Sequence, residues 1–182
     1  MSEIVILSGS PSANSRSEKV LRYLGGRLEQ RGFSVTHISV KDVPAEDLMF
    51  GNFKSPDVIR IAEQIGQAKG VIVGTPVYKA SYSGVLKALI DIMPQDILED
   101  TPALPVMTGG SMSHLLALEY ALKPLLATLK GVNLKGLYYM DSQLDKLAEQ
   151  PIIDEDAFLR TEKQLDYFIR KVSREQAARV YS

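Results

Sequence analysis

Short β-branched runs alternate with longer segments of helical period along the chain, and this alternation restricts the fold more than any other feature. The runs expected to form strands are Ile4–Leu7, Val35–Val40, Val71–Thr75, Leu104–Thr108 and Leu134–Met140. The segments expected to form helices are Ser15–Arg31, Ser55–Ala68, Ser83–Met93, Ser113–Lys130 and Asp154–Val180. Strands that alternate with helices in this way are typical of βαβ units, whose strands are parallel and covered on both faces.

This pattern predicts an α/β fold: a flavodoxin-like, doubly wound, five-stranded parallel sheet of order 2-1-3-4-5 with helices on both faces. The chain has 182 residues, of which 45% are hydrophobic, so we expect a single domain spanning residues 1–182. In such a sheet, ligands bind outside the carboxyl ends of the strands. The loops that follow the strands are therefore the segments to search for a site.

Composition excludes several classes of function. The 21 Lys and Arg nearly balance the 22 Asp and Glu, so no charge excess favours nucleic acid or an anionic membrane. Without cysteine there is no thiol nucleophile, and His37 and His114 are too few imidazoles for a metal site. The N-terminus has no basic region or cleavage site, and no apolar run approaches membrane-spanning length. We therefore expect a cytoplasmic protein.

The first candidate loop runs from Ser8 to Ser17 and is rich in hydroxyl groups, with Arg16 near its end. It precedes a helix, whose N-terminal amides and dipole favour an anion such as a phosphate monoester. The alternative is that Ser15 to Glu18 form a capping box, which would stabilise the helix by roughly 1 kcal/mol without any ligand. The loop lacks the glycines of a dinucleotide fingerprint and the Gly-Lys-Ser/Thr of a P-loop, so it indicates a mononucleotide such as FMN.

The second loop follows the strand Val71–Thr75 and carries a proline, a lysine and two tyrosines before the next helix. Because Pro76 has no N–H, the amides free to reach a ring edge begin at Val77. Tyr78 and Tyr82 could stack on a flavin or donate a hydroxyl, and Lys79 could neutralise charge near the ring or near a nicotinamide phosphate. Alternatively, the tyrosines belong to an interface and Lys79 is a solvated surface residue.

The third loop, residues 108–114, again joins a strand to a helix. Its paired glycines, Gly109 and Gly110, allow the backbone to approach a ligand closely, and Ser113 can cap the helix that follows. His114 could bond a flavin oxygen or the ribityl chain, or could simply be a surface residue. Three ligand-type loops at three strand ends predict one common crevice.

The fourth predicted helix, Ser113–Lys130, is apolar on nearly all sides, which indicates burial on a second side by another subunit. Pro124 lies inside it. Because proline has no N–H, the carbonyl of Tyr120 loses its α-helical partner, and a kink or π-bulge near Tyr120 is expected.

At these loops the chain resembles the NAD(P)H-dependent FMN reductase family, and within it the FMN reductases of two-component alkanesulfonate monooxygenase systems. The resemblance runs to about Met140 and does not cover the last forty residues. The matching segments are Ser8-Gly9-Ser10-Pro11 with Ser15-Arg16-Ser17, Thr75 to Gly84, Thr108-Gly109-Gly110, and His114 to Ala117 with Tyr120 to Pro124.

The resemblance implies hydride transfer from NADPH or NADH to FMN, held as a substrate or a loosely bound cofactor, and release of reduced FMN to a partner monooxygenase in sulfonate sulfur assimilation. It implies a homotetramer or dimer through helix Ser113–Lys130, and an inserted tyrosine at Tyr120 in reductases that treat flavin as a substrate. No acid, base or nucleophile is required. The side chains expected to matter for turnover are Tyr120, Lys79 and His114. The residues expected to hold the cofactor are Ser8, Ser10, Ser15, Arg16, Ser17, Pro76, Val77, Tyr78, Lys79, Ser81, Tyr82, Thr108, Gly109, Gly110, Ser111 and His114.

Three other functions fit parts of the pattern. A reductase that retains FMN and reduces quinones or azo dyes would share the fold and the loops. A flavodoxin-like electron carrier would need no nicotinamide site, but such carriers tend to be acidic, whereas the net charge here is -1. A hydrolase is disfavoured because Ser113 replaces the last glycine of a nucleophile elbow and no histidine follows His114 to complete a triad.

Overall fold

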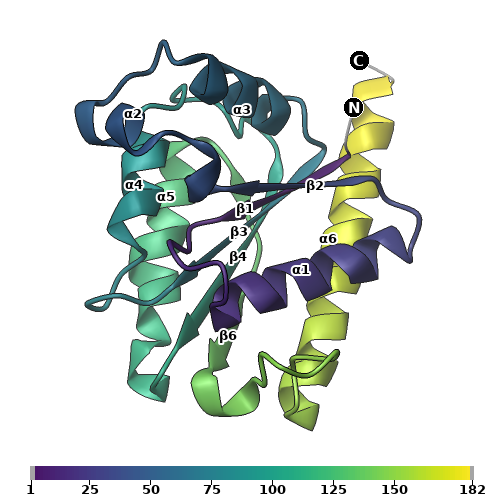
Figure 1. Cartoon of the computed structure of the whole chain (residues 1–182). Coiled ribbons are helices and arrows are strands. Elements are labelled where there is room, and N and C mark those ends of the chain that lie inside the picture. The colour runs from purple at the N-terminus through teal and green to yellow at the C-terminus, as the bar shows by residue number, and fades with distance from the viewer. Residues whose placement is uncertain (1–2, 181–182) are drawn as a thin grey trace.

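The computed structural model describes residues 3–180, with the side chains of residues 3–174. The strands are β1 (Ile4–Ser8), β2 (Val35–Ser39), β3 (Gly70–Pro76), β4 (Pro102–Gly109), β5 (Val132–Asn133) and β6 (Leu137–Met140). The helices are α1 (Arg16–Glu29), α2 (Ala45–Phe50), α3 (Pro56–Gly66), α4 (Gly84–Asp91), α5 (Lys123–Thr128) and α6 (Glu155–Val180). Figure 1 shows them wrapped around one twisted sheet.

All strand pairs in the sheet are parallel, and the order is β2-β1-β3-β4-β5, with β6 also pairing with β4. The predicted flavodoxin-like order is therefore confirmed. Because β1 lies between β2 and β3, the order reverses at β1, and a ligand crevice is expected at the carboxyl ends of β1 and β3.

The predicted fifth strand, Leu134–Met140, is a strand only over β6 (Leu137–Met140), and a separate short strand, β5 (Val132–Asn133), precedes it beside β4, so the sheet has six strands. Val132 and Asn133 pair with Pro102 and Ala103, and pairing resumes at Leu137 opposite Val106. Residues 134–136 thus lie beside only two residues of β4. One of these two is Pro105, which has no N–H for the ladder, and Gly136 takes a φ of +85° in the bulge.

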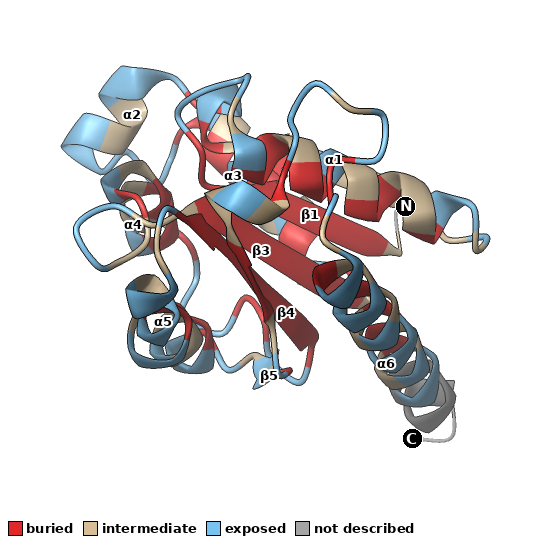
Figure 2. Cartoon of the chain, turned by 90° about the horizontal axis from the view of Figure 1, so that it is seen from below, coloured by how far each residue is buried: buried red, intermediate tan, exposed pale blue. Residues whose placement is uncertain are grey.

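The sheet divides the core into two layers. The side chains of Ile4 and Ile6 pack with α1 and α6, whereas those of Val5 and Leu7 pack with α3, α4 and α5, as the two-residue period of a strand requires. Figure 1 shows α1 and α6 together on one face, and Figure 2 shows the strands buried beneath helices whose outer surfaces are exposed. Near-continuous apolar strands are what a sheet covered on both faces needs.

The predicted helix Ser113–Lys130 is not one helix. It begins as a 3-10 turn, Met112–His114, continues as a π-helix, Leu118–Leu122, and ends as α5. The π-helix contains Tyr120, so the predicted π-bulge is confirmed. Its cause is Pro124, which cannot donate to Tyr120 in an α-helical ladder and stands at the start of α5.

Within residues 3–180, no helix combines the length and apolar character needed to cross a membrane.

Candidate functional site

The loops after β1, β3 and β4 meet at the carboxyl edge of the sheet and are bonded to one another. Ser8 aligns with Gly74, and Pro76 aligns with Thr108, so the three strands end side by side. The Ser83 hydroxyl donates to the Gly9 carbonyl at 2.5 Å, which joins the first loop to the second. The Val77 N–H donates to the Thr108 carbonyl at 2.8 Å, which joins the second loop to the third.

The first loop has five consecutive backbone N–H groups, those of residues 13–17, that are free to bind a ligand. The amides of Gly9, Ser10 and Ser12 donate to the Gly74 carbonyl and to the Ser8 and Ser10 hydroxyls. Within the described residues, by contrast, the amides of residues 13–17 have no acceptor in the protein. They lie at the start of α1, where the helix dipole also favours negative charge. This arrangement suits a phosphate group.

Most serine hydroxyls of this loop bond to the loop itself. The Ser10 hydroxyl donates to Ser15 Oγ at 2.8 Å and lies 3.0 Å from the Ser12 carbonyl, and the Ser15 and Ser17 hydroxyls are 3.0 Å apart. Ser8, Ser10 and Ser17 are almost fully buried. Their hydroxyls therefore shape the loop, while the backbone offers the free donors.

The capping box expected at Ser15–Glu18 is only half formed. The Ser15 hydroxyl accepts from the Glu18 N–H at 3.1 Å, as a cap should. The Glu18 carboxylate, however, does not return to the Ser15 N–H. Its Oε2 accepts from the Ser8 hydroxyl at 2.5 Å, and its Oε1 lies 3.1 Å from Arg22. The capping interpretation was therefore wrong in its second half, and the Ser15 N–H stays free.

The second loop ends in a tight two-residue turn. Tyr78 and Ser81 exchange backbone hydrogen bonds of 2.9 and 3.1 Å, and the intervening Lys79 and Ala80 have φ angles of +48° and +62°. Positive φ at both central positions is the geometry of a type I′ turn, which costs free energy for residues other than glycine. The turn holds Lys79 out into solvent, and Tyr78 is 47% exposed at its base.

The third loop is bonded to Tyr138 on β6. The Tyr138 hydroxyl donates to the Ser111 carbonyl at 2.5 Å. Burial raises the pKa of this hydroxyl, and the charge of Asp141 raises it further, so it remains a donor at neutral pH. A side chain at Gly109 would displace the Tyr138 hydroxyl, because a Cβ there would lie 2.6 Å from the Tyr138 oxygen. The Nδ1 atom of His114 is buried close by, without a partner in the described chain.

The structure brings the predicted loop residues to one edge but exposes them to different degrees. Those that are buried are Ser8, Ser10, Ser17, Thr108 and Gly109. Those of intermediate exposure are Ser15, Pro76, Val77, Ser81, Tyr82, Ser111 and His114. Those that are exposed are Arg16, Tyr78, Lys79, Gly110 and, on the π-helix, Tyr120.

Sequence reasoning missed four residues that build this edge: Glu18, Ser83, Tyr138 and Asp141. Asp141 follows β6 directly and lies 3.9 Å from Arg16, so a fourth strand end lies beside the first loop. Its position after a predicted strand was a usable signal. The bond of Glu18 to Ser8 joins residues ten apart and has no signature in the sequence.

A cavity of about 1120 Å³ lies elsewhere, beside α3 and the connection between α4 and β4. Its apolar residues include Phe53 and Ile97. Five carboxylates also line it, and they would repel a phosphate: Glu63, Asp91, Asp96, Glu99 and Asp100. The converging loops are therefore the better place for a mononucleotide.

A doubly wound sheet of this order, with three connected loops at its carboxyl edge and free amides in the loop after β1, is the arrangement of a flavodoxin-like mononucleotide-binding protein. The sequence matches the family model "NADPH-dependent FMN reductase" over residues 2–145. The chain therefore belongs to the NADPH-dependent FMN reductase family. Membership makes it an oxidoreductase that uses FMN with a reduced nicotinamide nucleotide.

Individual relatives agree with this assignment. The chain is 46% identical over 142 residues to an FMN reductase (NADPH) of Pseudomonas putida, covering 78% of this chain and 72% of the relative. It is 39% identical over 172 residues to an FMN reductase (NADPH) of Escherichia coli K12, covering 94% and 90%. A solved structure described as NADH:FMN oxidoreductase (EMOB), apo form, superposes with a TM-score of 0.84 at 34% identity, covering 95% of this chain and 90% of that one.

Proposed function

We propose that the protein supplies reduced FMN to a partner flavin-dependent monooxygenase, in sulfonate sulfur assimilation. The observation that carries the proposal is the loop with five free amides at residues 13–17, because it gives a mononucleotide phosphate a place without a dinucleotide fingerprint. Bound FMN would accept a hydride from NADPH or NADH. The protein then has to bind and orient two flat rings, which needs no general acid, base or nucleophile.

The residues proposed to hold FMN divide by loop. Residues 13–17 would bind the phosphate through their amides, with Arg16 adding a positive charge. The loop from Pro76 to Tyr82 and the loop from Thr108 to His114 would hold the isoalloxazine ring. Lys79 lies on an exposed turn, where its ammonium could meet the phosphates of the nicotinamide nucleotide. His114 would contact the flavin from the third loop.

We further propose that Tyr120 on the π-helix weakens the retention of FMN and so permits its exchange. Tyr120 is 78% exposed there, and Met112, Leu115 and Leu116 are 54%, 40% and 57% exposed next to it. We refer to these four residues as the π-helix face. An apolar face of this kind supports assembly into a homotetramer or dimer through this segment.

We further propose that the whole chain, residues 1–182, is one FMN-binding domain and that it works in the cytoplasm.

One assay tests this function. The purified protein should oxidise NADPH or NADH when free FMN is the acceptor, more slowly with riboflavin, and it should elute from gel filtration largely without flavin. Transfer should then be seen when a flavin-dependent monooxygenase consumes the reduced FMN. A yellow protein that keeps one FMN per chain and prefers a quinone or an azo dye as acceptor would contradict the proposal. Absence of any nicotinamide oxidation would favour an electron carrier instead.

A further inference from the structure

We propose that Glu18 is a specificity-determining residue that weakens the hold of the first loop on the phosphate of FMN, so that the flavin can exchange. This inference rests on the proposed function, because it places the FMN phosphate at residues 13–17. Glu18 stands directly after these residues in the first turn of α1. Its side chain is only 6% exposed, so a buried carboxylate lies beside the proposed anion site.

The Glu18 carboxylate is buried and contacts the first loop directly. Its Oε2 accepts the Ser8 hydroxyl at 2.5 Å, and Ser8 Oγ in turn lies 3.4 Å from the Ser10 amide that begins the loop. Its backbone N–H is bonded to the Ser15 hydroxyl at 3.1 Å. The Glu18 carboxylate is thus bonded to the first loop through Ser8, and the Glu18 backbone is bonded to the same loop through Ser15.

Glu18 and a bound phosphate compete for the same stabilisation. A carboxylate in the first turn of a helix interacts favourably with the helix dipole, and so does a phosphate at the helix N-terminus. When both are present, their like charges repel, and the burial of the Glu18 side chain makes this repulsion stronger than it would be between two groups in water. The loop is therefore stabilised in its ligand-free form and binds a dianion less tightly than its free amides would allow.

Positive charges near Glu18 offset this effect only in part. Arg22 pairs with Oε1 at 3.1 Å, but its side chain is 65% exposed, so solvent screens the pair. Lys19 and Lys146 line a cavity of about 440 Å³ together with Glu18 and Arg22, yet neither forms an ion pair with Glu18 in the described structure. The negative charge of Glu18 is thus incompletely neutralised next to the phosphate site.

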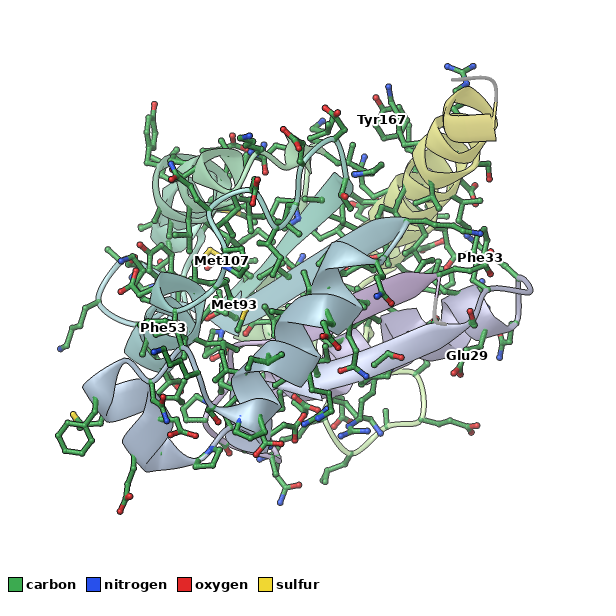
Figure 3. All side chains as sticks on the ribbon, turned by 90° about the horizontal axis from the view of Figure 1, so that it is seen from above. Glu29, Phe33, Phe53, Met93, Met107 and Tyr167 are labelled. Carbon is green, nitrogen blue, oxygen red and sulfur yellow. The ribbon has the colours of Figure 1, made fainter. Side chains whose placement is uncertain are left out.

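The test compares FMN with riboflavin, which lacks the phosphate, by titration followed through flavin fluorescence. Glu18→Gln keeps the shape of the side chain and an acceptor for Ser8 but removes the charge. We expect Kd for FMN to fall about fivefold and Kd for riboflavin to stay within about twofold, as expected for loss of one nearby like charge. Glu29→Gln is the matched control, since Glu29 is exposed on the last turn of the same helix (Figure 3) and should change neither Kd.

Three results would overturn the inference: no change in FMN binding, an equal change for FMN and riboflavin, or weaker binding of both. If Glu18→Gln does not fold, Arg22→Gln decides instead, because that side chain is mostly exposed. Arg22→Gln removes the positive charge that pairs with Glu18, so it should raise Kd for FMN more than Lys19→Gln does. Equal increases in Kd for the two variants would reject the proposal. Failure of the wild-type protein to bind FMN would instead reject the proposed function, and this inference with it.

Discussion

Ser83 belongs to two loops of the site at once. It is 1% exposed and caps α4, where its hydroxyl accepts from the Leu86 N–H at 3.2 Å. The same hydroxyl donates to the Gly9 carbonyl, and the Ser83 amide donates to Thr75 Oγ1 at 3.0 Å. One buried side chain therefore joins the loop after β1 to the loop after β3.

Replacement of this residue should cost more than the loss of a helix cap. Ser83→Ala leaves the buried Gly9 carbonyl without its donor and removes the cap, so we expect a loss of about 2–3 kcal/mol in unfolding free energy. Urea unfolding followed by circular dichroism measures it. Ser39→Ala is the control, because its hydroxyl caps a short 3-10 turn near the surface and should cost about 0.5–1 kcal/mol. Equal losses in the two variants would show that the link to Gly9 contributes nothing.

Among the elements, α6 carries an ion-pair cluster that attaches it to α1. Glu162 accepts from Arg27 NH2 at 2.6 Å and from Arg31 NH2 at 2.7 Å, with its side chain 21% exposed. Arg31 also reaches Asp166 at 2.9 Å. The bond to Glu162 raises the pKa of Arg27. These charges lie at the rim of the apolar layer between the two helices and the sheet, where water screens them less than on an open surface.

Loss of the shared carboxylate should therefore be measurable. Glu162→Gln leaves two partly buried guanidinium groups without their common partner, and we expect the unfolding free energy to fall by about 1–2 kcal/mol. The loss should shrink in high salt. Glu99→Gln serves as the control: both side chains of its pair with Lys130 are more than half exposed, so it should change stability by less than about 0.5 kcal/mol. Thermal unfolding of the two variants at low and high salt measures these losses. Equal losses of stability in Glu162→Gln and Glu99→Gln would contradict this prediction.

Elements were predictable from the sequence where local pattern decides them, and not where a neighbour does. The strands Ile4–Leu7 and Val71–Thr75 end within one residue of the observed ends, because apolar runs bounded by turn residues are local signals. The interruption between β5 and β6 depends on Pro105, about thirty residues earlier, and becomes visible only once β4 is known to be the neighbour. The π-helix could be predicted because its cause, Pro124, lies four residues from Tyr120.

At the scale of the whole molecule, the predicted strand order was enough to predict where the site lies. The parallel order places the three loops at one edge, so their convergence follows from the strand sequence alone. The partners of the side chains do not follow. The serines of the first loop look like ligand donors in the sequence, yet the folded loop bonds most of their hydroxyls internally and leaves the amides of residues 13–17 free. Such choices depend on burial, which a linear pattern does not show.

The proposed assembly of the molecule into a homotetramer or dimer would use the π-helix face. The inner side of this segment is buried within the chain through Leu118, Leu122 and Leu126, and the exposed side carries Leu116 and Tyr120. Exposed apolar side chains of this kind are hydrated at a cost unless another copy covers them. A charge placed at its centre should therefore separate the subunits without disturbing the fold of each one.

Leu116→Arg tests this at a side chain that is 57% exposed in the single chain. A buried, unpaired guanidinium opposes association by several kcal/mol, so sedimentation velocity should show a smaller species at micromolar concentration, with an unchanged circular dichroism spectrum. Leu159→Arg is the matched control, since Leu159 is 58% exposed on α6, on the opposite face of the sheet. If the assembly survives in Leu116→Arg, or if both variants dissociate equally, subunits do not meet through the π-helix face, and the exposure of Tyr120 needs another cause.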